Sequence, residues 1–487
     1  MIARVWLPIL LALCMVRLWI TPLPSSFWVD EAETAFIAQH GYNDPSLAIV
    51  PQVTASVYYW LPRVSYQIFG FSEIAERLPS LMAMALAVLL IAKLAARLIH
   101  PEASWFAVFA CLTLRAFNYE AANARPYALG ICVAATSLWL LVRWLDSGRW
   151  MDGFLFLASA SLLWRVQLIY WPFYLVYVVY FFAKHERRVS WAQAATIGAG
   201  LVLALLPVIS TALAVNREAL LHAFAPQPSV MDLAGAFKFR LVAGVAIAAW
   251  IVSRWRHWPR ENSAPSWSAI VLTAGWWAVQ PLALFAYSHI TGISVFSTRY
   301  VSIALPGVAL AATAGAAFFI PKAGWRISAL AMGIAALVLS GQWEELWPPH
   351  HNSDWRAASQ AANALGLGQD TPVLVVSPFI EAQPPLWRPD YSLPGFLYCH
   401  LDVYPVAGKP YLLPFDASPA AKQYAESLAV STLPAARRFL IYAGARDVTL
   451  WRDWFAARPE FAQWRSRLLG PFRDVDVALF EAPNSGR

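Results

Sequence analysis

The sequence predicts an all-α polytopic membrane protein that ends in a small extracytoplasmic α/β domain. Of the 487 residues, 59% are hydrophobic and only 13% are charged, whereas a soluble chain carries about 25% charged residues. Apolar runs of bilayer-spanning length recur up to residue 342, and after residue 343 the pattern changes to short apolar runs. We therefore expect a transmembrane domain over residues 1–342 and an α/β domain over residues 343–487.

About eleven apolar runs are long enough to predict transmembrane helices. They lie near residues 3–20, 78–98, 102–117, 126–145, 150–165, 168–183, 191–213, 239–253, 267–289, 300–320 and 326–342. The first run is flanked by Arg4 like a signal peptide, but no small-residue cleavage pattern follows it. We interpret it as a retained first helix.

Basic clusters occur in alternate loops between these runs. They are Arg4; Lys93 and Arg97; Arg143 and Arg149; Lys184, Arg187 and Arg188; Arg254, Arg256 and Arg260; and Lys322 and Arg326. The positive-inside rule assigns all six clusters to the cytoplasm. This predicts a multi-pass protein of the inner membrane with its N-terminus inside and its C-terminal domain outside. The net charge of +7 is explained by these loops, so nucleic acid is not an expected partner.

The C-terminal part contains signals for both strands and helices. Residues 371–379, 438–445 and 475–482 read as buried strands, and the stretch that starts at Asp354 reads as an amphipathic helix with Asp354 as its N-cap. Its length of about 145 residues allows a core of its own.

Three carboxylates follow the first apolar run, in "SSFWVDEAETAF". Asp30, Glu31 and Glu33 must lie outside the hydrocarbon, since an Asp at the centre of a span costs about 2.5 to 3.5 kcal/mol. Residues 30–40 are expected to form a helix that Gly41 ends. A purely structural alternative makes Asp30 the N-cap and Glu33 the third residue of a capping box.

A second helix is expected in the same outer loop. The stretch "TASVYYWLPRVSYQIFG" places Val57, Leu61, Val64 and Ile68 on one face. Both helices of the loop would suit the membrane surface, with their apolar faces in the lipid interface.

Several arginines lie at the outer ends of the predicted spans, against the positive-inside rule. They are Arg17, Arg63, Arg77, Arg115, Arg125, Arg165 and Arg299. Each alone is typical of a side chain that extends its charged head into the interface. Together they indicate an anionic ligand, because guanidinium groups bind phosphate through paired hydrogen bonds. Carboxylates and arginines at one membrane edge favour transfer chemistry on a lipid phosphate.

Four stretches also resemble, in order, the blocks of bacterial family 39 glycosyltransferases. They are "VDEAETAFIAQHG", "VYYWLPRVSYQIFGFSEIAERLPSLMAMALAVLLIAKLAARL", "NYEAANARPYALGICVAATSLWLLVRWL" and "STRYVSIALPGVALAA". These enzymes have the GT-C fold and are related to the protein O-mannosyltransferases and the lipid A aminoarabinose transferases. The resemblance covers residues 1 to about 345 and is most specific at the Asp-Glu pair, "FGFSEIAERLPS", "ARPYAL" and the late "RY" followed by proline.

The resemblance implies an inverting transfer of a sugar from a polyprenyl-phosphate donor to an acceptor hydroxyl of a lipid, glycan or protein. Asp30 matches the family's catalytic aspartate, which takes the acceptor's proton, and Glu31 matches its acidic neighbour. Cations stabilise the leaving phosphate, and the candidates are Arg125 and Arg299, followed by Arg63 and Arg77. The candidate substrate-binding residues are Tyr127, Tyr300, Tyr58, Tyr59 and Glu120.

One part of the family pattern is missing. Many members carry Lys/His-Pro-Pro-Leu-Tyr-Tyr where this chain has the six residues from Thr54 to Tyr59. The usual cation is therefore absent at Thr54. Either other arginines bind the donor phosphate, or the donor differs, or activity has been lost.

No metal site is assigned from the sequence. A divalent metal is possible at Asp30 and Glu31, as in some GT-C enzymes, but adjacent carboxylates on a helix point in different directions. Four histidines lie near the outer side without a defined ligand spacing; they are His40, His289, His350 and His351.

Two other classes of function stay open beside the enzyme. A glycolipid transporter or flippase would have a similar number of spans, but it would place ionisable residues near the membrane midplane. The carboxylates here gather in the outer loop instead, which favours the enzyme. A non-catalytic GT-C scaffold is the third alternative. The sugar could be mannose, aminoarabinose, galacturonate or glucose, and the acceptor stays equally open.

Overall fold

A computed structural model describes residues 2–219, 225–259 and 265–483, and the chain divides into two compact units. The first comprises Met1–Leu23, Gln52–Ser65 and Arg77–Pro348. The second comprises Pro24–Pro51, Tyr66–Glu76 and Pro349–Arg487. The C-terminal chain is thus close to the expected segment, but two stretches of the first outer loop group with it. Each unit is described by itself.

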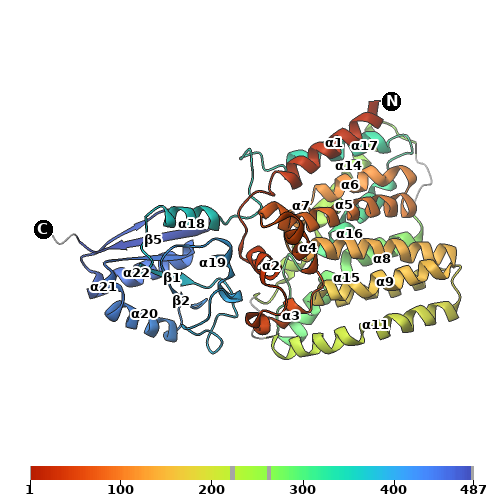
Figure 1. The fold of residues 1–487 in the computed structure, drawn as a ribbon. Coiled ribbons are helices and arrows are strands. Elements are labelled where there is room, and N and C mark those ends of the chain that lie inside the picture. The colour runs from red at the N-terminus through yellow and green to blue at the C-terminus, as the bar shows by residue number, and fades with distance from the viewer. Residues whose placement is uncertain (1, 220–224, 260–264, 484–487) are drawn as a thin grey trace. The chain divides into compact units, whose positions relative to one another are not determined.

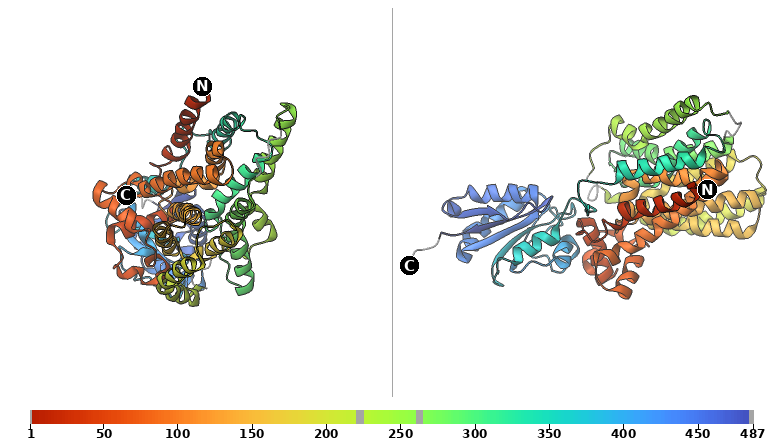
Figure 2. Two further views of the ribbon diagram at one scale, coloured as in Figure 1. Left: turned by 90° about the vertical axis from the view of Figure 1, so that its right-hand side faces the viewer. Right: turned by 90° about the horizontal axis from the view of Figure 1, so that it is seen from above.

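The first unit is a bundle of helices (Figures 1 and 2). Its longer helices are α1 (Ile2–Met15) with the π-helical turn η1 (Val16–Ile20), α5 (Glu73–Leu98), α6 (Ser104–Leu112), α8 (Tyr127–Ser147), α9 (Trp150–Val166), α10 (Tyr174–Ala183), α11 (Trp191–Arg217), α14 (Phe239–Trp255), α15 (Trp267–Thr291), α16 (Leu305–Ala317) and α17 (Trp325–Ser340). Shorter ones are α7 (Arg115–Ala121), α13 (Val230–Phe237), η3 (Pro101–Ala103), η4 (Leu168–Phe173) and η5 (Ser302–Ala304). All eleven expected segments contain a helix, and the chain is a multi-pass membrane protein.

The lengths of the helices differ from those of simple spans. Among the described residues, four helices are long and apolar enough to cross a membrane, namely α5, α8, α11 and α15. The pair α13 and α14 adds a fifth if it is one span, bent by 43°. Five further apolar helices have only 10–17 residues. The total of about eleven spans therefore stays a prediction.

Ion pairs bring several of the basic loops together. Asp146 binds both Arg97 and Lys184, at 2.8 and 3.0 Å, and Arg143 binds Asp152 at 2.8 Å. Three of the predicted cytoplasmic clusters therefore lie at the same end of the unit, as the alternation of loops requires. Arg260 and the side chain of Arg4 lie outside the described residues.

Small residues allow close helix packing in the first unit. A Cβ at Gly307 of α16 would overlap the backbone of α15 at Trp277. Glycine at such a crossing lets two backbones approach, which is how membrane helices gain packing contacts.

The second unit is built around a five-stranded mixed sheet (Figure 1). Its strands are β1 (Pro372–Val376), β2 (Lys409–Leu413), β3 (Arg438–Gly444), β4 (Arg465–Leu468) and β5 (Val475–Glu481), in the order β2-β1-β3-β5-β4. One face packs against α20 (Pro419–Ser431), α21 (Leu433–Ala436) and α22 (Ala445–Ala456). On the other face, Tyr442 of β3 packs against Trp355 and His400, which belong to α18 (Trp355–Asn363) and α19 (Cys399–Val403).

The expected C-terminal elements are confirmed, with two omissions. β1, β3 and β5 occupy the three predicted strand segments, and the side chain of Asp354 accepts a hydrogen bond from the Ala357 N–H at 3.0 Å as the N-cap of α18. β2 and β4 were not predicted. β2 contains Pro410 at a sheet edge, and every residue of β4 is exposed, so neither shows a buried apolar run.

The outer loop forms two helices with different environments. In α4 (Trp60–Phe69), Leu61, Val64 and Ile68 are exposed, as expected of a helix in the lipid interface. In α2 (Val29–His40), residues 31–38 are all buried. The expectation that α2 lies along the membrane surface is therefore wrong, because a helix buried on all sides has no apolar face left for lipid.

Candidate functional site

Asp30 and Glu31 lie in the first turn of α2, in the second unit. The helix begins at Val29 with Trp28 as its N-cap, and the Trp28 side chain makes no capping hydrogen bond. The capping-box alternative is therefore not formed, since Asp30 lies inside the helix. Its carboxylate is half-buried, whereas Glu31 is fully buried. An acidic side chain in the first turn is favoured by the helix dipole.

The acidic face of α2 packs against α19. The Cys399 thiol is fully buried, and this burial together with the carboxylates of Glu33, Asp402 and Asp30 raises its pKa well above the usual value. His40 at the end of α2 binds Asp402 through Nε2 and Oδ2 at 2.8 Å. The C-terminal chain therefore supports α2 along its length.

Glu31 has a histidine neighbour that the sequence analysis named only as one of four outer histidines and did not pair with it. His350 Nε2 lies 4.0 Å from Glu31 Oε1, and both side chains are buried. Only its position after the last predicted span could have drawn attention to it. The pair lies within the second unit.

The first unit brings together most of the predicted phosphate and substrate residues. Arg125 is 92% buried, and its guanidinium lies over the Tyr59 ring, 6.0 Å from the centroid. Tyr58 is fully buried with its hydroxyl 3.1 Å from that of Ser80. Asn123 Nδ2 donates to Glu120 Oε2 at 2.9 Å. This is a buried cation among aromatic and hydroxyl groups, an environment that strengthens binding to an anion.

The late "RY" pair joins this cluster through aromatic rings. The rings of Tyr127 and Tyr300 are 6.3 Å apart, and Arg299 lies 5.6 Å from the centroid of Tyr300. Tyr170 of η4 also belongs to this cluster, since it lies close to Glu120, Tyr127 and Tyr300. Sequence reasoning missed Tyr170, because a tyrosine within an apolar run carries no signal of its own.

Two predicted cations make different contacts. Arg77 is fully buried, and its Nη1 donates to the carbonyl of Leu23 at 2.7 Å, within the turn that follows η1. Arg63 is half-buried on α4, a helix with an exposed apolar face. The Arg77 guanidinium therefore binds the backbone of this turn. If it also bound the donor phosphate, it would have to do so while keeping this hydrogen bond.

Two further outer arginines bind backbone carbonyls. Arg17 donates hydrogen bonds of 2.5 to 2.7 Å to four carbonyls of the segment after α17, those of Gly341, Gln342, Glu345 and Leu346. Arg165 donates to the carbonyl of Ala204 at 3.0 Å. Both contacts favour the structural interpretation of these arginines.

The stretch that lacks the family's cation has its own polar contact. Thr54 is exposed at the end of α3 (Pro51–Thr54). Ser56 Oγ donates to the Val166 carbonyl at 2.6 Å and accepts from the Tyr58 N–H at 3.2 Å. Ser56 thus holds the backbone just before Tyr58 and Tyr59. The buried guanidinium beside these tyrosines is that of Arg125.

The described residues contain no group of three or more His, Cys, Asp or Glu side chains that could hold a metal ion. His289 binds the Pro228 carbonyl at 3.0 Å, and the His351 ring stacks on Trp28 at 4.8 Å. Metal dependence stays a matter for experiment.

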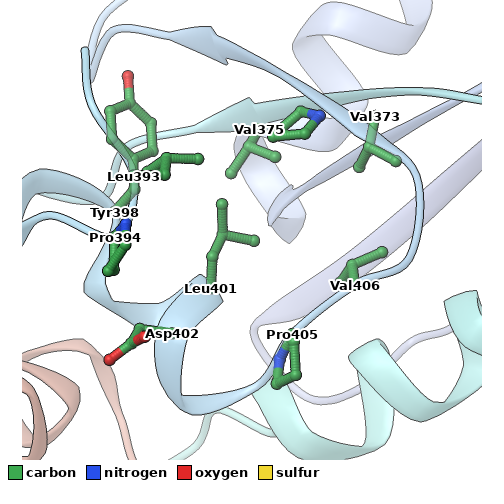
Figure 3. Close-up of a pocket in the computed structure, with 10 residues that line it drawn as sticks. Val373, Val375, Leu393, Pro394, Tyr398, Leu401, Asp402, Pro405 and Val406 are labelled. Atoms are coloured by element: carbon green, nitrogen blue, oxygen red, sulfur yellow. The ribbon is translucent and has the colours of Figure 1, made fainter. Parts of the chain in front are cut away.

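The second unit also has a pocket of about 310 Å³ between the sheet and α19 (Figure 3). Val373 and Val375 of β1 and Leu401 of α19 form apolar walls. Asp402 lies at its edge and points away from these side chains, and its carboxylate binds His40 of α2. The ion pair between Asp402 and His40 therefore connects the edge of the pocket to α2.

Comparison with known proteins identifies the fold. A family model described as dolichyl-phosphate-mannose-protein mannosyltransferase matches residues 54–214. The crystal structure of apo ArnT from Cupriavidus metallidurans matches with a TM-score of 0.59 and 13% identity, over 98% of each chain. The chain has the GT-C fold. A second ArnT crystal structure, bound to undecaprenyl phosphate, matches with a TM-score of 0.56 and 12% identity, over 97% of this chain and 98% of ArnT. No curated protein sequence matches the chain.

The GT-C fold covers the transmembrane unit and the C-terminal α/β part alike, since the match extends over almost the whole of both chains. The family-model match is narrower. It includes seven of the candidate residues, Tyr58, Tyr59, Arg63, Arg77, Glu120, Arg125 and Tyr127, and it excludes Asp30, Glu31, Arg299 and Tyr300.

Proposed function

We propose that the protein is an inverting membrane glycosyltransferase. It moves a sugar from a polyprenyl-phosphate donor to an acceptor hydroxyl on the outer face of the inner membrane. The observation that carries this proposal is the fold match to ArnT over almost the whole length of both chains, in a structure that contains undecaprenyl phosphate. The match of residues 54–214 to a mannosyltransferase family model supports the same class of donor.

The proposed reaction uses one carboxylate as a base. Asp30 accepts the proton of the acceptor hydroxyl while that oxygen attacks the anomeric carbon from the face opposite the phosphate. The bond between the anomeric carbon and the phosphate oxygen breaks, and the polyprenyl phosphate leaves with both electrons. The configuration at the anomeric carbon is inverted. Glu31, beside Asp30, supports the orientation of this helix turn.

The leaving phosphate needs positive charge in the transition state. Arg125 is the first candidate because its guanidinium is buried beside Tyr59, where its interaction with an anion is screened little by water. Arg299 is the second, and Tyr127 and Tyr300 can donate hydrogen bonds. Buried arginine and tyrosine side chains of this kind suit a lipid phosphate.

The base is tested by replacing Asp30 with Asn and measuring transfer from polyprenyl-phosphate sugars to an envelope extract. We expect the rate to fall by at least about 100-fold, the scale on which a general base contributes. Asp44→Asn is the matched control. Asp44 caps η2 (Pro45–Ile49) in the same outer segment, and Asn caps as well as Asp. Wild-type transfer by the Asp30→Asn variant would show that Asp30 is not the base.

The phosphate site is tested with Arg125→Gln, for which we expect the KM for the donor to rise at least about tenfold, the loss of one charged hydrogen bond. Arg115→Gln is the control, because Arg115 is exposed on α7. An unchanged donor KM in the Arg125 variant would place the phosphate elsewhere.

A further inference from the structure

Three separate stretches of the second unit meet at Phe27, three residues before Asp30. The Phe27 ring is fully buried and lies 6.2 Å from that of Phe71 and 6.5 Å from that of Tyr404. The Phe27 backbone N–H donates to the Tyr404 hydroxyl at 2.8 Å. The entry to α2 is therefore packed against both the outer loop and the C-terminal chain.

A carboxylate connects these stretches. Glu73 Oε1 accepts a hydrogen bond from the Tyr404 hydroxyl at 3.0 Å and another from Arg356 Nη1 at 2.9 Å. Arg356 Nη2 donates to the Pro24 carbonyl at 2.8 Å. Arg356, Glu73 and Tyr404 thus form a closed set of bonds around residues 24–27, and all three bonds include a charged group, which strengthens them.

The tyrosine in this set must be protonated, because its hydroxyl accepts one hydrogen bond and donates another. Burial, and next the nearby charge of Glu73, raises the pKa of Tyr404 above its usual value. The Tyr404 hydroxyl therefore keeps its proton, and with it the ability to donate to Glu73, over the whole range of ordinary pH.

The contact is continuous along the chain that leads to α2. Ser25 Oγ accepts from the His350 N–H at 3.0 Å, and Ser26 Oγ accepts from the Arg356 N–H at 3.2 Å. The next residue after Phe27, Trp28, stacks on His351. Each of the five residues 24–28 is therefore contacted by a residue of the C-terminal chain.

We infer that the C-terminal domain positions Asp30, and that Arg356, Glu73 and Tyr404 are the positioning residues. The inference rests on the proposed role of Asp30 as base. Fixing residues 24–28 fixes the start of α2, and with it the direction of the Asp30 side chain in the first turn of this helix. The C-terminal domain then contributes to the rate of transfer, because misplacing the base by about 1 Å can lower the rate about 100-fold.

Tyr404→Phe tests the inference by removing one hydroxyl while keeping the ring. We expect kcat to fall by about 10- to 100-fold with the KM for the donor unchanged. Arg356→Lys keeps the positive charge, but an ammonium group cannot donate to Glu73 and Pro24 in the planar geometry of the guanidinium. We again expect a lower kcat with an unchanged KM for the donor. Tyr398→Phe is the control. Tyr398 is buried like Tyr404, and its hydroxyl donates to the Leu413 carbonyl at 2.7 Å. This bond involves neither Glu73 nor residues 24–28.

Two further measurements separate positioning from general damage. In an Asp30→Asn background, Tyr404→Phe should lower the residual rate no further, since both changes act through one group. Backbone amides of residues 27–36 should exchange hydrogen faster in the Tyr404 and Arg356 variants than in wild type, and not in the Tyr398 variant.

These outcomes distinguish the two proposals. If Asp30→Asn alone keeps the wild-type rate, the proposed base is wrong, while faster amide exchange would still show that Tyr404 holds α2. Unchanged kcat and unchanged exchange in both the Tyr404 and Arg356 variants would overturn the positioning role. A full additional loss of rate in the double variant would overturn it as well.

Discussion

Gly130 offers the sharpest test of the tyrosine cluster in the first unit. It is buried in α8, and a Cβ there would overlap the ring of Tyr170. Tyr170 in turn interacts with Glu120 and Tyr127, two of the candidate substrate residues. Gly130→Ala therefore displaces one side chain of the cluster without touching any candidate residue itself.

The size of the displacement follows from the distances. The added Cβ would overlap Cε2, the nearest atom of the Tyr170 ring, and would lie 2.9 Å from Cζ and the hydroxyl oxygen, whereas non-bonded carbon atoms approach to about 3.5 Å. The shortfall at Cζ is about 0.6 Å, and the ring must move by more than this because Cε2 is closer still. Overpacking of this kind costs about 1 to 3 kcal/mol, partly offset by the better helix propensity of Ala, about 1 kcal/mol.

The assay combines unfolding in mixed micelles with steady-state transfer. We expect the free energy of unfolding to fall by up to about 2 kcal/mol, and kcat/KM for the donor to fall by about tenfold or more. Gly198→Ala is the control, since Gly198 lies in α11 and a Cβ there would meet nothing within 4 Å. If the Gly130 and Gly198 variants behave alike in both measurements, the Tyr170 cluster plays no part in the reaction.

The other predictions concern His400 and Arg17. His400 is fully buried between aromatic rings, its ring nitrogens find no hydrogen-bond partner among the described residues, and burial lowers its pKa to about 3. The unfolded chain binds this proton near pH 6.5, so stability should fall as the pH drops from about 6.5 towards 3, by about 2 kcal/mol between pH 7 and 5. His400→Phe should reduce that loss in a pH series of unfolding, and an unchanged slope would contradict the assignment. Arg17→Lys should expose residues 341–348 to protease, because one ammonium cannot reach four carbonyls; Arg115→Lys is the control, and equal cleavage of the two variants would show that Arg17 does not hold this segment.

Local patterns predicted the helices well. Each of the eleven apolar runs contains a helix, and Gly41, with a φ of 84°, ends α2 as expected. The length of an apolar run and the presence of a glycine that ends a helix are properties of a short stretch of sequence, so both can be recognised without knowing the fold. The three predicted strands were found for the same reason, while the exposed β4 gave no signal.

Contacts between segments that lie far apart in the sequence could not be predicted from such local patterns. The sequence marked Arg17, Arg77 and Arg125 alike as outer arginines. The structure separates them, since Arg17 and Arg77 donate to backbone carbonyls and Arg125 lies buried beside Tyr59. Which group a guanidinium meets depends on residues far along the chain, because its donors reach only neighbouring atoms.

Local sequence patterns were sufficient to predict the membrane class, the helix positions and the acidic stretch at Asp30, because these depend on hydropathy and on residue order. The folded structure was needed to show that α2 is buried against α19 and that Arg356 and Tyr404 hold the chain before it. Residues more than 300 positions apart form these contacts. No pattern within a single segment records them, because they exist only once the chain has folded back on itself.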